Sequence, residues 1–85
     1  MKYQVFVHRS VQKAVLKFEL SLVRRIRNAI AGLSVDPRPS GCKKLLGLND
    51  CFRIRVGKYR ILYLISNEEM KVTVYRVAHR KETYR

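Results

Sequence analysis

The sequence predicts an α+β fold in which two N-terminal helices pack on one face of a small antiparallel sheet. Three observations predict it: the first half of the chain has apolar residues at helical spacing, the second half has strand-like alternation, and a proline-containing loop at residues 36–41 separates the halves. The 85 residues suffice for one modest hydrophobic core. We therefore expect a single domain over residues 1–85.

The N-terminal half is expected to hold one strand and two helices. Apolar residues alternate with polar ones over residues 3–7, which predicts a first strand. Ser10 is a candidate N-cap for the first helix. Helical spacing then runs from Val11 to Leu33 with a break near Leu20, so two consecutive helices are predicted.

Four further strands are expected after the loop, because short apolar runs there are separated by turn residues. They are Lys43–Leu46, Cys51–Val56, Lys58–Ile65 and Met70–Ala78.

The charge of the chain indicates a polyanionic partner. Nineteen Lys and Arg stand against six Asp and Glu, giving a formal net charge of +13. A folded chain of this charge repels itself unless an anion relieves the repulsion. Nucleic acid is the first expectation and an acidic protein segment the second, while an inert basic surface is the alternative.

No segment reads as a membrane anchor or a metal site. The first residues lack an apolar signal segment, and the longest apolar run, Ile61–Ile65, is too short to span a bilayer. We expect a cytoplasmic location and no membrane partner. Cys42 and Cys51 lack partners at zinc-ligand spacing, so both are expected to be buried free thiols, and no metal or other cofactor is expected.

The stretch CFRIRVGKYRILY is predicted to form a hairpin that opposes two arginines. Gly57 and Lys58 suit a two-residue type II′ turn, because glycine supplies the positive φ of the first turn position. Counting outward from the turn places Arg55 opposite Arg60, with Arg53 diagonal to them. The alternate residues of both strands then share the other face, which can pack on the helices.

Opposed like charges destabilise an antiparallel pair, and nothing in this hairpin neutralises them. A local rule broken without evident compensation is expected at a functional site. We therefore interpret the arginines as an anion-binding site. The alternative is that they are edge charges that deter aggregation.

The next hairpin decides which other residues join the arginines. If Ile65 pairs with Met70, Tyr75 lies near Arg60. The core side would then carry Val72, Val74 and Arg76, and the arginine side would carry Thr73, Tyr75, Val77 and His79. Arg80 and Tyr84 in the tail could close over this surface.

These residue types suit metal-independent cleavage of RNA. Arginines hold a phosphate bidentately and stabilise charge on a phosphoryl oxygen, while the 2′-hydroxyl of the RNA attacks. Arginine cannot accept a proton, which leaves His79 or Tyr84 as the general base. Tyr84 could instead stack on a base, and His79 could simply be a satisfied histidine at a strand end.

The whole chain resembles the RelE/ParE toxin superfamily of bacterial toxin–antitoxin pairs. The resemblance rests on DPRP after the helical half, on KKLLGLNDCFRIRVGKYRILY and on the ending VAHRKETYR. It implies a small antiparallel sheet with two helices on one face. RelE-type members cut messenger RNA in the ribosomal decoding site, leave a 2′,3′-cyclic phosphate and are neutralised by an antitoxin, whereas the ParE branch acts on DNA gyrase.

The resemblance also implies roles for individual residues. Arg53 and Arg55 match the basic pair before the hairpin turn, Arg60 matches the phosphate-stabilising arginine, Arg80 matches the basic residue of the terminal motif, and Tyr84 matches the C-terminal tyrosine. RelE proteins have lysines where this chain has Arg53 and Arg55, which moves the base role to His79 or Tyr84. Additional candidates for RNA binding are Lys43, Lys44, Lys58, Tyr75 and Lys81.

The predicted function is therefore that of a RelE-like toxin, a metal-independent endoribonuclease acting on messenger RNA at the ribosome. Its expected partners are messenger RNA with 16S ribosomal RNA contacts, an acidic antitoxin, and operator DNA through the antitoxin complex only. The alternatives are a ParE-like gyrase inhibitor, since fold alone does not determine activity, and a degenerate toxin that only binds its antitoxin.

Overall fold

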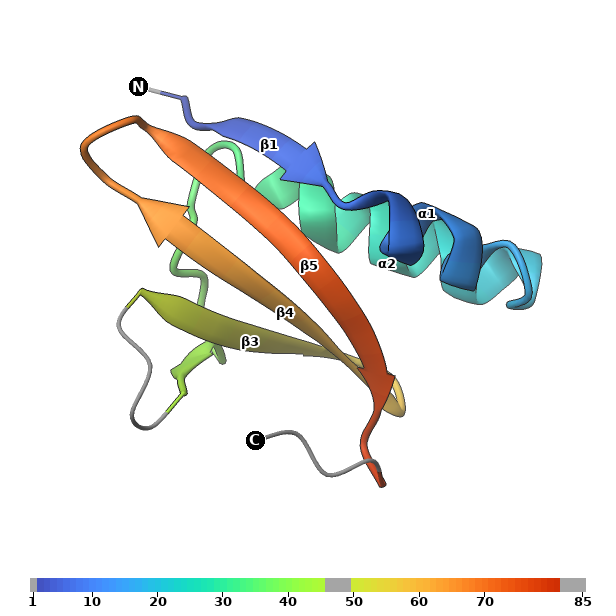
Figure 1. Ribbon diagram of the computed structural model, residues 1–85. Coiled ribbons are helices and arrows are strands. Elements are labelled where there is room, and N and C mark those ends of the chain that lie inside the picture. Colours follow the sequence, from blue (N-terminus) through green and yellow to red (C-terminus); the bar gives the residue numbers. More distant parts are fainter. Residues whose placement is uncertain (1, 46–49, 82–85) are drawn as a thin grey trace.

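The computed structural model describes residues 2–45 and 50–81, and within them the chain forms two helices and five strands (Figure 1). In chain order these are β1 (Gln4–Val7), α1 (Arg9–Val15), α2 (Leu20–Gly32), β2 (Lys43–Lys44), β3 (Cys51–Val56), β4 (Tyr59–Ser66) and β5 (Lys71–His79). Each predicted element is present, although β2 is shorter than expected and the predicted end of that strand, Leu46, lies outside the described residues.

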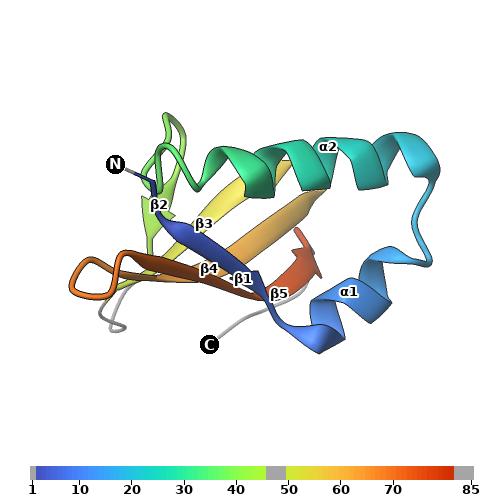
Figure 2. The ribbon, with the colours of Figure 1, turned by 90° about the horizontal axis from the view of Figure 1, so that it is seen from above.

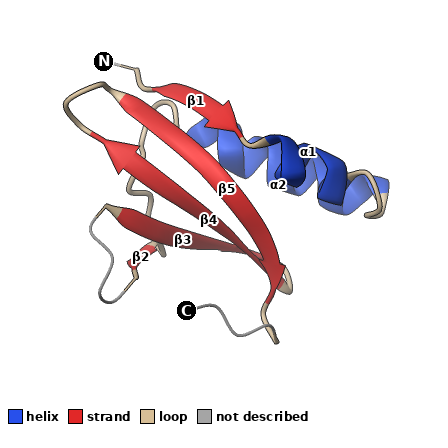
Figure 3. Ribbon diagram, in the orientation of Figure 1, coloured by secondary structure: helices blue, strands red, loops and turns tan. Residues whose placement is uncertain are grey.

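The strands form one mixed sheet in the order β1-β5-β4-β3-β2. The pairs β2–β3, β3–β4 and β4–β5 are antiparallel, and β1 adds to β5 in parallel. Figure 2 shows α2 lying across one face of the sheet, and Figure 3 shows that α1 follows directly from β1 on the same side. The predicted α+β class, with two helices on one face of a mainly antiparallel sheet, is confirmed.

The start of α1 differs from the prediction. The N-cap is His8 instead of Ser10, because the helix begins at Arg9, directly after β1 ends. The backbone N–H of Ser10 donates to Nδ1 of His8 over 3.1 Å, so the imidazole takes the part expected of a serine hydroxyl. The break between the helices also comes a few residues earlier than Leu20, since α1 ends at Val15.

The hydrophobic core lies between α2 and the adjacent face of the sheet. Ile26 and Leu33 of the helical half pack against a sheet face that includes Ile61, Val72 and Val74. The predicted core face of the first hairpin is confirmed by the burial of Phe52, Ile54, Val56, Ile61, Tyr63 and Ile65. Tyr59, at the start of β4, lies on the same side by register but is only half-buried.

Tyr63 joins the core to the proline-containing loop. Its hydroxyl donates to the carbonyl oxygen of Pro37 over 2.9 Å, and its side chain has no exposed surface. Burial raises the pKa of the Tyr63 phenol above its usual range, because the phenolate would lose its hydration. The group therefore serves as a neutral hydrogen-bond donor within the core.

The β3–β4 hairpin has the predicted register. Arg55 pairs with Arg60, and Arg53 pairs with Leu62. Gly57 has a φ of 60°, while Lys58 is not among the residues of positive φ, as a type II′ turn requires. The two-residue loop thus fixes which side chains meet across the strands.

The β4–β5 pairing does not follow the prediction. Ile65 pairs with Val72 instead of Met70, because Met70 adopts a φ of 53° inside a longer turn. Farther along, Tyr63 pairs with Val74 but Leu62 pairs with Arg76, which leaves Tyr75 as an extra residue. This β-bulge disrupts the ladder and exchanges the two faces for every residue beyond it.

The bulge corrects several predicted positions. Val72 and Val74 lie on the core side and Thr73 on the opposite side, as predicted. Beyond the bulge, Arg76 faces away from the core, whereas Val77 and His79 lie on the core side. The predictions for these last three residues are wrong, because counting along the strand assumed strict alternation.

Candidate functional site

Basic side chains gather on the side of the sheet that faces away from the helices, which we call the arginine face. The strand register assigns to it Lys43, Arg53, Arg55, Arg60 and Arg76. Arg55 lies directly opposite Arg60, and Lys43 lies directly opposite Arg53. Within each of these pairs the two positive charges repel each other. An anion bound between the two side chains of a pair would reduce that repulsion.

The arginine face has a buried floor beneath its charges. Arg53 is 9% exposed, and Leu62 and Ala78 between the basic residues are 1% and 0% exposed. Arg55 is exposed and Arg60 is half-buried. Since low-dielectric surroundings strengthen charge interactions, an anion at this floor would be held more strongly than one on an open surface.

The residues after β5 return to the tip of the β3–β4 hairpin. The backbone N–H of Arg80 donates to the carbonyl of Lys58 over 2.7 Å, and the guanidinium of Arg60 donates to the carbonyl of Arg80. The backbone of Arg80 therefore lies beside Arg60 and the hairpin turn. Lys58, exposed in the turn, lies beside the same segment.

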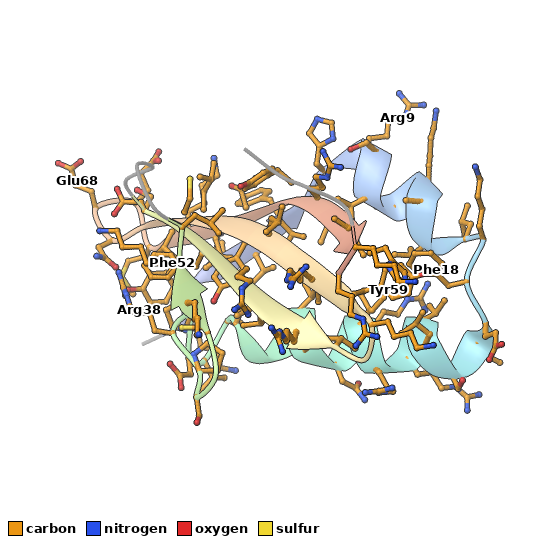
Figure 4. All side chains as sticks on the ribbon, turned by 90° about the horizontal axis from the view of Figure 1, so that it is seen from below. Arg9, Phe18, Arg38, Phe52, Tyr59 and Glu68 are labelled. Atoms are coloured by element: carbon orange, nitrogen blue, oxygen red, sulfur yellow. The ribbon has the colours of Figure 1, made fainter. Side chains whose placement is uncertain are left out.

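His79 lies at this end of the sheet but on the core side. His79 pairs with Tyr59, and the two rings meet edge-on with their centroids 5.2 Å apart. The ring of Tyr59 also packs on that of Phe18, with 4.6 Å between the centroids (Figure 4). Nδ1 of His79 accepts the backbone N–H of Lys81 over 3.1 Å. The Nδ1 lone pair of His79 is therefore occupied by this backbone N–H.

The remaining predicted residues are scattered. Lys44 pairs with Phe52 and so lies on the opposite side from Lys43. Tyr75 is the bulged residue, and its predicted position beside Arg60 is wrong, because Ala78 is opposite Arg60 instead. Tyr75, Arg76 and Val77 together line a shallow hollow beside α1. Lys81 is exposed in the turn after β5. Tyr84 lies outside the described residues.

Arg76 is the member of the arginine face that sequence reasoning missed. Strict alternation along β5 placed it in the core, and only the bulge at Tyr75 brings it to the other side. A charged residue assigned to a core position was itself the signal, because arginine is rarely buried in a core. That conflict indicates a register irregularity before Arg76.

A separate hollow lies on the helix side, between β1, α1 and α2. Its volume is about 780 Å³, and its apolar lining includes Val5, Val15 and Ile30. Arg9 and Lys13 of α1 and Arg27 of α2 also line it. Because the lining is mainly aliphatic, the hollow is unsuited to binding a phosphate. Its apolar residues and basic rim are complementary to an amphipathic segment that carries acidic residues beside its apolar ones.

Among the described residues, no three His, Cys, Asp or Glu side chains come together in a way that could hold a metal ion. Cys51 is buried and Cys42 half-buried, and both are free thiols. Within the same residues, neither helix has the length and apolar character that crossing a bilayer requires.

The fold and the arginine face define a class. Residues 6–84 match the model of the ParE toxin of type II toxin–antitoxin systems, parDE, and the chain belongs to this family. It is accordingly a toxin of the RelE/ParE type.

Its relatives carry RelE names. A curated protein of Methanocaldococcus jannaschii with the provisional name toxin RelE1 is 25% identical over 88 residues, covering 100% of this chain and 98% of that protein. The archaeal RelE–RelB complex of Pyrococcus horikoshii OT3 contains a chain with a TM-score of 0.87 and 26% identity, covering 98% of this chain and 100% of that one. A chain of the RelBE2 complex of Mycobacterium tuberculosis has a TM-score of 0.79 and 27% identity, covering 93% and 99% respectively.

Proposed function

We propose that this toxin is a metal-independent endoribonuclease that cleaves messenger RNA at the ribosome. The observation that carries the proposal is the direct opposition of Arg55 and Arg60 beside a buried floor. A fold that tolerates this repulsion gains from a bound phosphodiester, which relieves it. The similarity to RelE-named proteins supports the same activity.

In the proposed mechanism, the arginine face binds the scissile phosphate and the 2′-hydroxyl of the preceding ribose attacks it. Arg55 and Arg60 hold the non-bridging oxygens, and Arg53, with Arg80 close to Arg60, adds positive charge where negative charge develops. The products are a 2′,3′-cyclic phosphate and a free 5′-hydroxyl.

Two protons must move in this reaction, one from the attacking hydroxyl and one to the leaving oxygen. His79 lies on the core side of the sheet and its Nδ1 lone pair is occupied by the N–H of Lys81, so we assign the base role to Tyr84 and take the proton for the leaving oxygen from a water molecule. Tyr84→Phe should then lower cleavage at all pH values, whereas His79→Ala should leave cleavage nearly unchanged. Equal losses of cleavage in the two variants would contradict this assignment.

Mapping of cleavage sites tests the activity itself. Primer extension on messenger RNA from cells that express the chain should show new 5′ ends, and Arg60→Ala should lose them by a factor of about 100 or more, the usual effect of removing one transition-state donor. Arg24→Gln, on the exposed side of α2, is the matched control and should cleave normally. Intact messages during growth arrest by the wild-type chain would refute the proposal.

Exposed lysines next to the arginine face are proposed to contact the ribosome. Lys43, Lys58 and Lys81 are exposed around the face and could bind phosphates of 16S ribosomal RNA. We place this activity in the cytoplasm, where ribosomes and messenger RNA meet.

An acidic antitoxin is the proposed protein partner. The net charge of +13 favours an acidic segment, and the related chains of Pyrococcus horikoshii and Mycobacterium tuberculosis are in complexes with their RelB and antitoxin partners. Such a segment could cover the arginine face with carboxylates and fill the apolar hollow beside α1. Operator DNA would be bound only through that complex.

Inhibition of DNA gyrase is the second candidate, because the family model that matches is that of ParE. Under this alternative the toxin acts by protein contact, and the arginine face would be dispensable. Purified protein that blocks gyrase supercoiling, with messages left intact and Arg60→Ala still active, would select it.

A further inference from the structure

The bulge at Tyr75 has a specific effect on the arginine face. If β5 continued in the register set by Val72 and Val74, Arg76 would point toward the helices and its neighbour Val77 toward solvent. The extra residue reverses both. An arginine is thereby kept out of the core and delivered to the side that already carries Arg53, Arg55 and Arg60. Bulges commonly re-aim side chains next to functional sites.

Arg76 completes a row across four strands. Lys43 on β2 pairs with Arg53 on β3, Arg53 pairs with Leu62 on β4, and Leu62 pairs with Arg76 on β5. Neighbouring strands lie about 4.8 Å apart, so the backbones of Arg53 and Arg76 are separated by roughly 10 Å. Because Leu62 between them is buried, the charges of the row flank an apolar floor.

Accessibility within the row is greatest at its two ends. Arg53 is 9% exposed, whereas Lys43 and Arg76 are both exposed. A polyanion that approaches the sheet would therefore meet the ends of the row before it reaches Arg53. A flexible chain of phosphates can contact both ends and the middle at once, which a single small anion cannot do.

We propose that Arg76 is a second phosphate-binding residue, which holds a phosphate adjacent to the one bound by Arg55 and Arg60. Single-stranded RNA then enters the arginine face at Arg76 on β5 and passes the Arg55–Arg60 pair on its way toward β2. This inference rests on the proposed function, because it assumes that the arginine face binds RNA. Arg76 is a positioning residue: it fixes the path of the strand but does not contact the reacting atoms.

Salt-dependent binding measures this role. Fluorescence anisotropy of a short fluorescein-labelled oligouridylate, titrated with the purified chain at several salt concentrations, gives the slope of log K against log salt. Each phosphate contact contributes about 0.7 to that slope for single strands, so Arg76→Gln should lower it by about that amount, and Arg76→Lys should restore it. Arg24→Gln controls for loss of one positive charge elsewhere on the surface.

The outcomes separate the two proposals. An unchanged slope in Arg76→Gln, with wild-type binding intact, would overturn the role of Arg76 and leave the proposed function standing. Wild-type protein that binds oligouridylate without any salt dependence would remove the RNA-binding face itself. In cleavage assays Arg76→Gln should raise KM several-fold and leave kcat unchanged, whereas a merely structural role would lower the folded fraction and hence the apparent kcat.

Discussion

The helix-covered side of the sheet buries Ile61, Val72 and Val74 completely, whereas the other side sets Arg55 against Arg60 and Lys43 against Arg53. Apolar burial on the first side favours folding, and repulsion on the second opposes it. The two sides share the same three central strands. The core packing of these strands therefore compensates for the repulsion on the arginine face.

The division between the two sides is not complete. Leu62 and Ala78 belong to the arginine face by register, yet they are 1% and 0% exposed. The arginine face thus has buried apolar residues on β4 and β5, with basic residues around them. Three substitutions test whether the two sides of the sheet contribute differently to stability and to activity.

The largest effect is expected from Ile65→Ala. Ile65 is 2% exposed on the core side, and removing its methyl groups leaves a cavity that should lower the free energy of unfolding by about 2–5 kcal/mol. The neighbouring Leu64, on the other side of the same strand, is 40% exposed. Denaturant unfolding of Leu64→Ala should show a clearly smaller loss, and equal losses would remove the distinction between the sides.

Tyr63→Phe should have an intermediate effect that depends on pH. Losing the hydrogen bond to Pro37 should lower the free energy of unfolding by about 1–3 kcal/mol near neutral pH, because the buried carbonyl loses its donor. Above pH 10.0, the ordinary pKa of tyrosine, the unfolded wild-type chain loses a proton that burial retains in the folded state. Wild-type stability then falls as pH rises.

Tyr63→Phe lacks this proton, so the difference in stability between the two proteins should shrink as the pH rises above 10.0. Urea unfolding at several pH values measures it. Tyr3→Phe, which removes a hydrogen bond to Asn67 at the surface, is the control at neutral pH and should lose less stability. A difference that stays constant or grows with pH would show that burial does not raise the pKa of Tyr63.

Arg55→Gln should have the smallest effect on stability, and in the opposite direction. Removing one of two opposed charges should raise the free energy of unfolding by about 0.2–1 kcal/mol at low salt, with less gain at high salt, where screening already weakens the repulsion. RNA cleavage should fall in the same variant. Arg24→Gln should change neither quantity, and a loss of stability in Arg55→Gln would show that the pair is not repulsive.

The first hairpin shows what a sequence can determine. A two-residue loop at Gly57 and Lys58 leaves one register, so the opposition of Arg55 and Arg60 follows from counting. The core face of the hairpin follows from the same count. Local turn chemistry and alternation suffice here because no residue is inserted between the turn and the paired arginines.

The second hairpin shows where such counting fails. Its turn is longer, Met70 takes a left-handed conformation, and Tyr75 is inserted as a bulge, so two independent shifts accumulate along β5. Val72 and Val74 were placed correctly because the shift at the turn is an even number of residues. Arg76, Val77 and His79 were misplaced because the bulge adds one more. Tertiary pairing, and not local propensity, decides these positions.

The role of a residue in β5 should be transferred from one relative to another by comparing which β4 residue each one pairs with, and not by sequence alignment alone. The relatives described above share 25–27% of their residues with this chain, so alignments around a short strand depend on very few matches. A homologue without the extra residue at Tyr75 would show the opposite set of side chains from there to the end of the strand. An ungapped alignment would then equate Arg76 of the arginine face with a core residue of the homologue, and a one-codon deletion would exchange the two sets of side chains along the end of this strand.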